Sequence, residues 1–273
     1  MNSWKFSKST NKDVEFFTIP AFDETGGVKH CFTTRIGGVS APPYESLNLG
    51  TRTEDSRQNV FKNYEIICKA LDIDVKNLVL SHQTHSDNIL IACNEHRGNG
   101  IFYDTRFSEI DGLITNKKDV ALVTFYADCV PIFILDKKRR VIALAHSGWR
   151  GTVKKIGKKV IDRMISAFNT EPKDCVIGIG PSIGKCCYEV DDYVINQFKD
   201  SYSTTEEFIK EKGKGKYHLD LWEANKLSIL ESGVPYSNIS ISGICTRCNN
   251  DLFFSYRGEN GKTGRMAAII QLI

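Results

Sequence analysis

The segment ALVTFYADCVPIFILDKKRRVIALAHS, residues 121–147, decides the fold that this sequence predicts. It contains three runs, at 121–125, 131–135 and 141–145, that consist almost entirely of apolar residues. Short runs of this kind are typical of strands at the centre of a sheet that is covered on both faces. The basic run at 137–140 separates the last two strands, so we expect it to form a hairpin turn.

Strand-like and helix-like segments flank this core on both sides. Runs rich in β-branched and aromatic residues predict strands at 14–19, 28–34, 78–80, 88–92, 176–181, 239–244 and 267–272. Apolar residues at helical spacing predict helices at 57–71, 152–168, 191–198, 204–212 and 219–232. Strands and helices do not alternate strictly, so we predict an α/β protein of the α+β sandwich type. We expect a single domain over 1–273, with a mixed β-sheet flanked by helices.

Composition narrows the class of protein. The net charge of +3 is too small to indicate a nucleic-acid partner. The N-terminal residues lack the apolar region of a signal peptide, and no run approaches the roughly 18 apolar residues of a membrane span. We therefore expect a cytoplasmic protein with no membrane association, as a monomer or a weak homodimer.

The nine cysteines do not indicate a disulfide scaffold, because the number is odd and the chain is long. Cys186 and Cys187 are adjacent, and Cys245 and Cys248 form a CxxC pair. A lone CxxC is a weak signal for zinc or redox chemistry, and adjacent cysteines are poorly placed for tetrahedral ligation. We interpret all four as ordinary thiols.

Metal-ligating side chains stand where apolar strands meet loops. These are His82 and His85 in SHQTH, Cys129 after 121–126, and His146 after 141–145. Two imidazoles and one thiolate are a normal set for catalytic zinc, which keeps its fourth position for water or substrate. His82 and His85 would point to opposite faces of a strand, so we expect one ligand from that pair. The spacing does not decide which of the two it is.

The same residues allow chemistry without a metal. Cys129 could act as a nucleophile with His146 as its base, oriented by Asp128 or by a backbone group. Zinc ligation and thiol catalysis both require a thiolate beside an imidazole, so both interpretations stay open.

A multicopper oxidase is excluded, because six histidines cannot supply its copper sites. Copper in the zinc site would be adventitious, as would any oxidation of phenols.

Two arginines stand at positions that favour an anion. Arg35 ends a predicted strand just before Gly37 and Gly38, and Arg150 lies close to His146 at a helix N-terminus. Arginine and exposed N–H groups at such positions bind phosphate. The sequence has no Walker A, HExxH or zinc-deaminase signature, and no convincing dinucleotide fingerprint.

An ordered series of motifs extends along nearly the whole chain. It comprises TRIGGVS at 34–40, SLNLG at 46–50, QTHS at 83–86, DGLIT at 111–115, ADCVP at 127–131, HSGWRG at 146–151, GIGPSI at 178–183, CYEV at 187–190, FFSYR at 253–257 and TGR at 263–265. In this order the set resembles the laccase-domain family, long described as multicopper polyphenol oxidases and also understood as zinc purine nucleoside phosphorylases. A peptidoglycan-editing role is attached to the same family.

The resemblance implies a ligand set and an activity. It selects His85 over His82 and places zinc on His85, Cys129 and His146. It implies phosphorolysis of adenosine, inosine, guanosine and methylthioadenosine, with adenosine deamination as a second activity. Purine nucleosides and phosphate would then be the binding partners. It also implies a compact fold related to cysteine hydrolases.

We assign further roles on this basis. Arg35 joins the catalytic set and orients phosphate toward the anomeric carbon, while zinc acts as a Lewis acid. Arg35, Asn48, Asp128 and Arg150 form the predicted substrate-binding set. Asp128 and His82 are candidates for the acid that protonates the leaving purine.

Two rival functions belong to different classes. An amidase would use zinc or Cys129 to hydrolyse an amide of a UDP-linked muropeptide, and it would not need phosphate. A non-catalytic zinc protein would bind metal without turnover, and the open coordination position argues against it.

Overall fold

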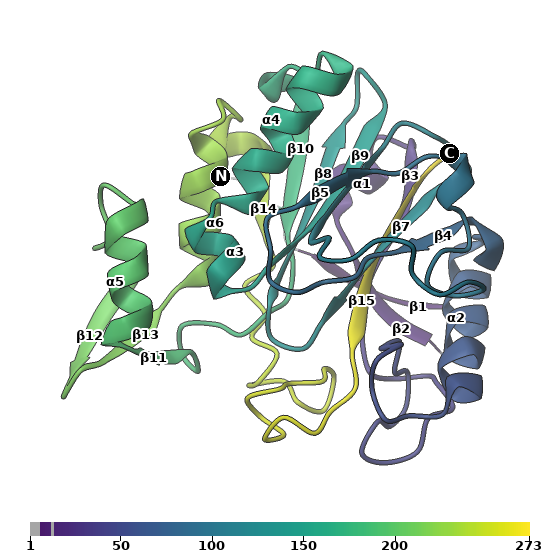
Figure 1. Cartoon of the computed structure of the whole chain (residues 1–273), viewed down its shortest axis with the longest axis horizontal. Coiled ribbons are helices and arrows are strands. Elements are labelled where there is room, and N and C mark those ends of the chain that lie inside the picture. The colour runs from purple at the N-terminus through teal and green to yellow at the C-terminus, as the bar shows by residue number, and fades with distance from the viewer. Residues whose placement is uncertain (1–5, 12–13) are drawn as a thin grey trace.

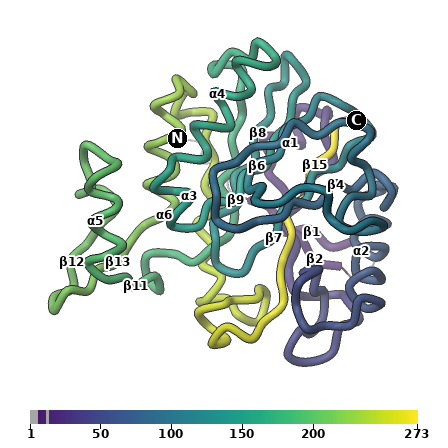
Figure 2. The backbone as a smooth tube through the Cα atoms, in the orientation of Figure 1, coloured from purple at the N-terminus to yellow at the C-terminus, as the bar shows by residue number. Residues whose placement is uncertain are grey.

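The computed structural model describes residues 6–11 and 14–273 of the chain. Two six-stranded sheets lie face to face, and helices cover their outer faces (Figure 1). The first sheet has the order β1 (Ser7–Asn11), β2 (Val14–Thr18), β3 (Val28–Thr33), β15 (Met266–Leu272), β7 (Ala121–Tyr126) and β4 (Leu78–Leu80). Its strands are antiparallel, except that β4 pairs in parallel with β7. The last strand, β15, thus lies beside β3 from the start of the chain (Figure 2).

The second sheet contains the strands predicted at 131–135 and 141–145. Its order is β14 (Ile239–Ile241), β10 (Cys175–Ile179), β8 (Val130–Asp136), β9 (Val141–Ser147), β6 (Gly112–Thr115) and β5 (Ile89–Ile91). β8 and β9 form the predicted hairpin around residues 137–140. The pairs β10–β14 and β5–β6 are parallel.

Alternation along β8 explains why the sheets stack. Ile132 and Ile134 point to the helices on the outer face, whereas Phe133 and Leu135 enter the layer between the two sheets. All four side chains are buried. Successive residues of a strand face opposite sides, so a strand that is apolar throughout must be covered on both.

The helices complete the outer layers. α2 (Arg57–Leu71) packs on the first sheet, and α3 (Trp149–Val153), α4 (Ile156–Phe168) and α6 (Leu221–Leu230) pack on the second. A small third sheet of β11 (Glu189–Asp191), β13 (Lys216–Leu219) and β12 (Ile209–Gly213) lies to one side with α5 (Asp192–Ser201) (Figure 1). Short helical turns are α1 (Pro20–Asp23), η1 (Val75–Asn77), η2 (Asn94–His96), η3 (Pro172–Asp174) and η4 (Tyr236–Asn238).

The predicted α/β class with mixed strand directions is confirmed, and the predicted helix over 57–71 has the bounds of α2. The chain differs in forming two stacked sheets where we expected one. The helix expected at 152–168 is two helices, because Lys155 adopts a left-handed backbone (φ 55°) between α3 and α4. The prediction of a helix at 204–212 is wrong. Ile209 begins β12 there and pairs with β13, so a tertiary partner overrides local helical spacing.

Among the described residues, no helix combines the length and the apolar character that a bilayer crossing requires.

Candidate functional site

Three of the predicted side chains meet at one point. The ligand atoms of His85, Cys129 and His146 all lie within 4.8 Å of one another. Cys129 Sγ is 3.7 Å from His85 Nε2, and the two imidazole centroids are 5.0 Å apart. We call these three residues the His–Cys–His cluster.

Strand pairing accounts for this meeting. β7 belongs to the first sheet and β8 to the second, so Cys129 lies on the short connection that crosses between them. The β8–β9 register pairs Pro131 with His146, which places His146 beside Cys129. The loop that carries His85 also crosses between sheets, from β4 to β5. His85 itself has a left-handed backbone (φ 63°), a conformation that is costly for most residues and clusters at functional sites.

Asp111 is a further residue of the site, and the sequence pattern assigns it no role. Its carboxylate accepts hydrogen bonds from the backbone N–H groups of Thr84, His85 and Ser86 and from the Ser86 hydroxyl. Asp111 Oδ1 also lies 2.7 Å from His146 Nδ1. This contact orients the imidazole and leaves Nε2 for a ligand, as carboxylates do behind metal-bound histidines. The only sequence signal was its position at the start of the DGLIT motif.

Charge is concentrated around the thiol. Burial opposes ionisation of Cys129, but the adjacent His146 and His85 outweigh burial and lower the pKa of the thiol. Burial likewise disfavours protonated His146, but Cys129 and Asp111 outweigh it and raise the imidazole pKa. Burial would raise the pKa of Asp111, yet the bonds from His146 and Ser86 lower it. The metal-free site therefore favours a thiolate beside an imidazolium.

Gly148 gives the cluster its space. A Cβ atom on Gly148 would lie 2.7 Å from His85 Cδ2 and 3.0 Å from Cys129 Sγ. Its backbone (φ −70°) suits any residue, so the need for glycine is one of volume. The site thus offers one sulfur and two nitrogen donors, a carboxylate behind one imidazole, and space that no side chain fills at Gly148. This arrangement fits a metal ion with three protein ligands.

The cluster forms part of the wall of a cavity of about 610 Å³. Besides the cluster, the described lining residues include aromatic and basic side chains. The aromatic residues are Phe125, Trp149, Tyr188 and Tyr256, and the basic ones are Arg52, Arg257 and Arg265. Planar apolar walls with a few cations suit a flat heterocycle that is carried by or near an anion.

Asp128 lines this cavity, but its carboxylate is already engaged. It accepts from the hydroxyls of Thr246 and Ser255 at 2.7 Å each and from the backbone N–H of Arg257. Asp128 thereby fixes the loop that follows β14 and supplies part of the cavity wall. These bonds hold the Asp128 carboxylate beside Cys129.

Arg35 and Asn48 lie outside the described residues that line the cavity. The Arg35 guanidinium donates to the carbonyls of Glu45 and Asn250 and pairs with Glu259 at 3.1 Å. These contacts use Nε and Nη1 of Arg35 and join its side chain to segments outside the cavity wall, and its predicted phosphate role stays a prediction. The sequence does not show these contacts, because backbone carbonyl partners cannot be inferred from residue types.

Asn48 acts behind the cavity wall. Its Oδ1 accepts from the backbone N–H groups of Gly50 and Arg265, both of which line the cavity. Its side-chain amide donates to Thr53 and Asp55. The fully buried Asn48 thus shapes the wall without reaching the ligand space.

Arg150 and His82 also lie outside the lining set of described residues. Arg150 is exposed and stacks over the Trp149 ring at 4.3 Å. His82 is half-buried, and its Nδ1 has no hydrogen-bond partner within the described part of the chain. The structure therefore brings His85, not His82, to the cluster.

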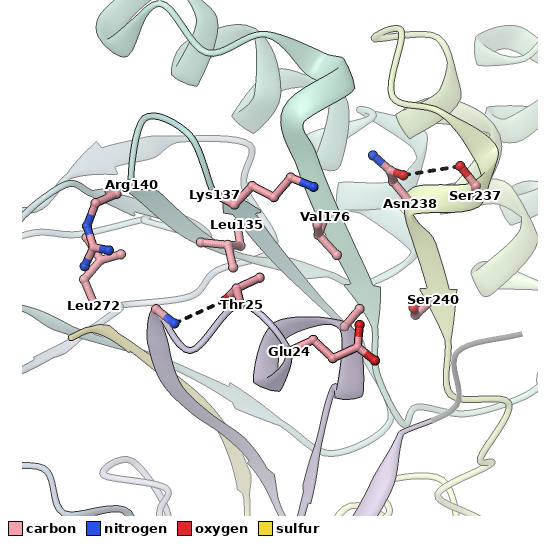
Figure 3. Close-up of a pocket in the computed structure, with 12 residues that line it drawn as sticks. Glu24, Thr25, Leu135, Lys137, Arg140, Val176, Ser237, Asn238, Ser240 and Leu272 are labelled. Carbon is pink, nitrogen blue, oxygen red and sulfur yellow. Dashed lines mark hydrogen bonds between the residues drawn. The ribbon is translucent and has the colours of Figure 1, made fainter. Parts of the chain in front are cut away.

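A second cavity, of about 510 Å³, lies elsewhere (Figure 3). Lys137 and Arg140 of the β8–β9 turn line it, together with Glu24 and Thr25 after α1 and Asn238 of η4. None of its described lining residues is a cysteine or a histidine. The chemistry that the sequence predicts thus belongs to the first cavity.

Residues 29–273 match a family model described as multi-copper polyphenol oxidoreductase laccase. The chain belongs to this laccase family. It is 39% identical over 240 residues to "Purine nucleoside phosphorylase YlmD" of Bacillus subtilis, covering 88% of this chain and 86% of that protein. It is also 34% identical to a "Purine nucleoside phosphorylase" of Bacteroides thetaiotaomicron, covering 97% and 98% of the two chains.

Two solved structures agree with the fold. The crystal structure of Bacillus licheniformis hypothetical protein YfiH has a TM-score of 0.93 at 35% identity, covering 97% of this chain and 99% of that one. YlmD of Geobacillus stearothermophilus has a TM-score of 0.91 at 35% identity, covering 97% and 98%.

Replacement of Gly148 by alanine tests the space around the cluster. The added methyl group must displace His85 or Cys129, so we expect Gly148→Ala to weaken metal binding by about 10-fold or more while the fold persists. Chelator competition and thermal unfolding measure the two effects. Gly27→Ala is the matched control, because its Cβ meets its nearest neighbour at an ordinary 3.6 Å. Equal metal affinity in both variants would contradict this account.

The lowered thiol pKa predicts a pH profile for the metal-free protein. The Cys129 thiolate persists below the ordinary thiol pKa of about 8.5 and is lost only as the pH falls through the lower folded value. Alkylation of Cys129 by iodoacetamide, followed by peptide mass spectrometry, should therefore continue below pH 8.5. His146→Gln removes the cation, so its alkylation midpoint should move up to the ordinary value or higher. Identical midpoints in the two proteins would refute the ion pair.

Proposed function

We propose that this protein is a metal-dependent purine nucleoside phosphorylase. It would cleave adenosine, inosine, guanosine and methylthioadenosine with phosphate, giving the free base and ribose 1-phosphate or its methylthio analogue. The names of its relatives support the reaction class. The observation that carries the proposal is the three-ligand His–Cys–His cluster in the wall of an aromatic, arginine-bearing cavity.

The metal is proposed to be zinc, held by His85, Cys129 and His146. When bound, zinc would supply a Lewis acid beside the substrate. Two imidazoles and a thiolate are ligands that zinc accepts, and Asp111 fixes the orientation of one of them. Copper would bind the same donors adventitiously.

Side chains of the cavity account for recognition of a purine nucleoside. Phe125, Trp149, Tyr188 and Tyr256 offer flat surfaces on which a purine can stack. Arg257 lies over the Tyr188 ring at 5.4 Å, so a cation stands beside an aromatic wall. These features support a planar base bound next to an anionic group.

Phosphate binding is proposed to use the cavity arginines. Arg257, Arg265 and Arg52 line the ligand space, whereas Arg35 and Arg150 do not. Charge-assisted bonds from such groups would hold phosphate for attack on the anomeric carbon of the ribose. The bond from the carbon to the purine nitrogen breaks, a bond to a phosphate oxygen forms, and the electron pair leaves with the purine.

Asp128 is proposed to position the site and not to protonate the leaving base. Its two oxygens are taken by Thr246, Ser255 and the Arg257 backbone. His82 lies outside the described cavity lining, so it is also poorly placed for that step. Deamination of adenosine is proposed as a second activity of the same metal site and the same purine pocket.

Base release decides the proposed reaction. Purified protein is incubated with inosine or adenosine, with and without phosphate, and the free base and sugar phosphate are quantified. We expect phosphate-dependent release of hypoxanthine and adenine, and a loss of at least about 100-fold in Cys129→Ala because a metal ligand is gone. Cys93→Ser is the matched control, since Cys93 lies at η2 and outside the described cavity lining.

Two results would contradict the phosphorylase proposal. One is the absence of base release from protein that is shown to hold metal. The other is release that does not depend on phosphate. If no base is released, the same protein is tested for amino-acid release from a UDP-linked muropeptide, the reaction that the amidase alternative predicts.

A further inference from the structure

A second group of potential metal ligands lies outside the His–Cys–His cluster. The four sulfur atoms of Cys186, Cys187, Cys245 and Cys248 lie within 4.8 Å of one another. We call these residues the cysteine quartet. From the sequence we interpret them as ordinary thiols, whereas the fold places them together.

The topology explains their meeting. β10 and β14 are parallel neighbours, so the chain leaves both strands at the same edge of the second sheet. The pairing continues past the strand ends, where Ser182 bridges to Cys245. Cys186 and Cys187 follow β10, and Cys248 follows Cys245 by one turn of chain. Two cysteine pairs that are far apart in sequence thus come from adjacent strand ends.

The sulfur separations fit tetrahedral ligation better than disulfide pairing. Cys248 Sγ lies 3.6 Å from Cys186 Sγ and 3.4 Å from Cys187 Sγ. Four thiolates about 2.3 Å from a central zinc would be about 3.8 Å apart. A disulfide requires a sulfur–sulfur distance of about 2.05 Å, and one disulfide would leave the other two sulfurs without a partner in the quartet.

One sulfur of the quartet has a backbone donor. The backbone N–H of Gly184 points at Cys245 Sγ, 3.3 Å away. The Arg247 guanidinium lies against the carbonyl of Cys187 at 3.5 Å, which brings a cation next to the group. Such a donor and a nearby cation would offset part of the negative charge that four thiolates leave on a divalent metal.

We infer that the cysteine quartet is a second metal centre, a closed tetrathiolate site for Zn²⁺. Binding replaces four S–H protons by four zinc–sulfur bonds, releases those protons and changes no oxidation state. Four protein ligands leave no open position, so this centre is structural, in contrast to the three-ligand cluster.

The quartet braces the wall of the substrate cavity. Cys245 is followed by Thr246, whose hydroxyl donates to Asp128. Cys187 is followed by Tyr188, which lines the cavity. A metal on the quartet would join these two wall segments without touching the substrate.

Metal counting tests this inference without any reliance on activity. Protein made in zinc-supplemented medium is purified under reducing conditions, dialysed and analysed for zinc per chain. We expect two zinc ions in the wild type, one in Cys248→Ser and one in Cys129→Ala. Loading with Co²⁺ should give the intense visible bands of a tetrathiolate site in Cys129→Ala and not in Cys248→Ser.

Controls keep the result decisive. Cys93→Ser should retain two zinc ions, because Cys93 lies outside both groups. If Cys248→Ser does not fold, Cys186→Ser takes its place, since the Cys186 side chain is also exposed. The inference is overturned by a wild type without zinc, by unchanged zinc in the quartet variants, or by a disulfide within the quartet.

Discussion

The buried carboxylate of Asp111 is the interaction on which the site depends. It receives four hydrogen bonds from the loop of residues 84–86 and contacts the imidazole of His146 on β9. A buried charge is costly unless donors and an opposite charge surround it. Asp111 satisfies this requirement by joining the segment that carries His85 to the strand that carries His146. The geometry of the proposed metal ligands therefore depends on the hydrogen bonds and charge of this one side chain.

The two stacked sheets bring the functional segments to a common edge. β4 and β7 of the first sheet are parallel and end there, and β8 begins there. β9 ends beside the start of β8, and the parallel pair β10 and β14 ends beside it as well. The His–Cys–His cluster and the cysteine quartet both arise from these ends. Asp128 connects them, because it precedes Cys129 and binds Thr246 in the loop that follows Cys245.

Local pattern was sufficient for part of the structure and the site. The apolar runs at 121–125, 131–135 and 141–145 form the strands β7, β8 and β9. Cys129 and His146 follow or end these strands and therefore lie close together. These strands can be predicted because a strand that is buried on both faces consists almost entirely of apolar residues. The choice of His85 over His82 came from the family resemblance, not from spacing.

The remaining features depend on partners that sequence spacing does not name. The sequence offers Arg35 as an anion ligand, but it does not show that two backbone carbonyls and Glu259 contact its Nε and Nη1. The segment 204–212 has helical spacing, yet it supplies β12 because β13 lies beside it. The cysteine quartet required the knowledge that β10 and β14 are parallel neighbours. Asp111 belongs to no periodic pattern that would single it out. Its place in the site comes from the hydrogen bonds that it accepts from backbone N–H groups.

Anomalous scattering at the zinc edge from crystals of the zinc-loaded protein tests the central claim most directly. We expect a zinc ion bound by His85 Nε2, Cys129 Sγ and His146 Nε2, with a fourth position that faces the cavity and holds no protein ligand. The absence of zinc between these three residues would contradict the account, and so would a fourth protein side chain that closes the site.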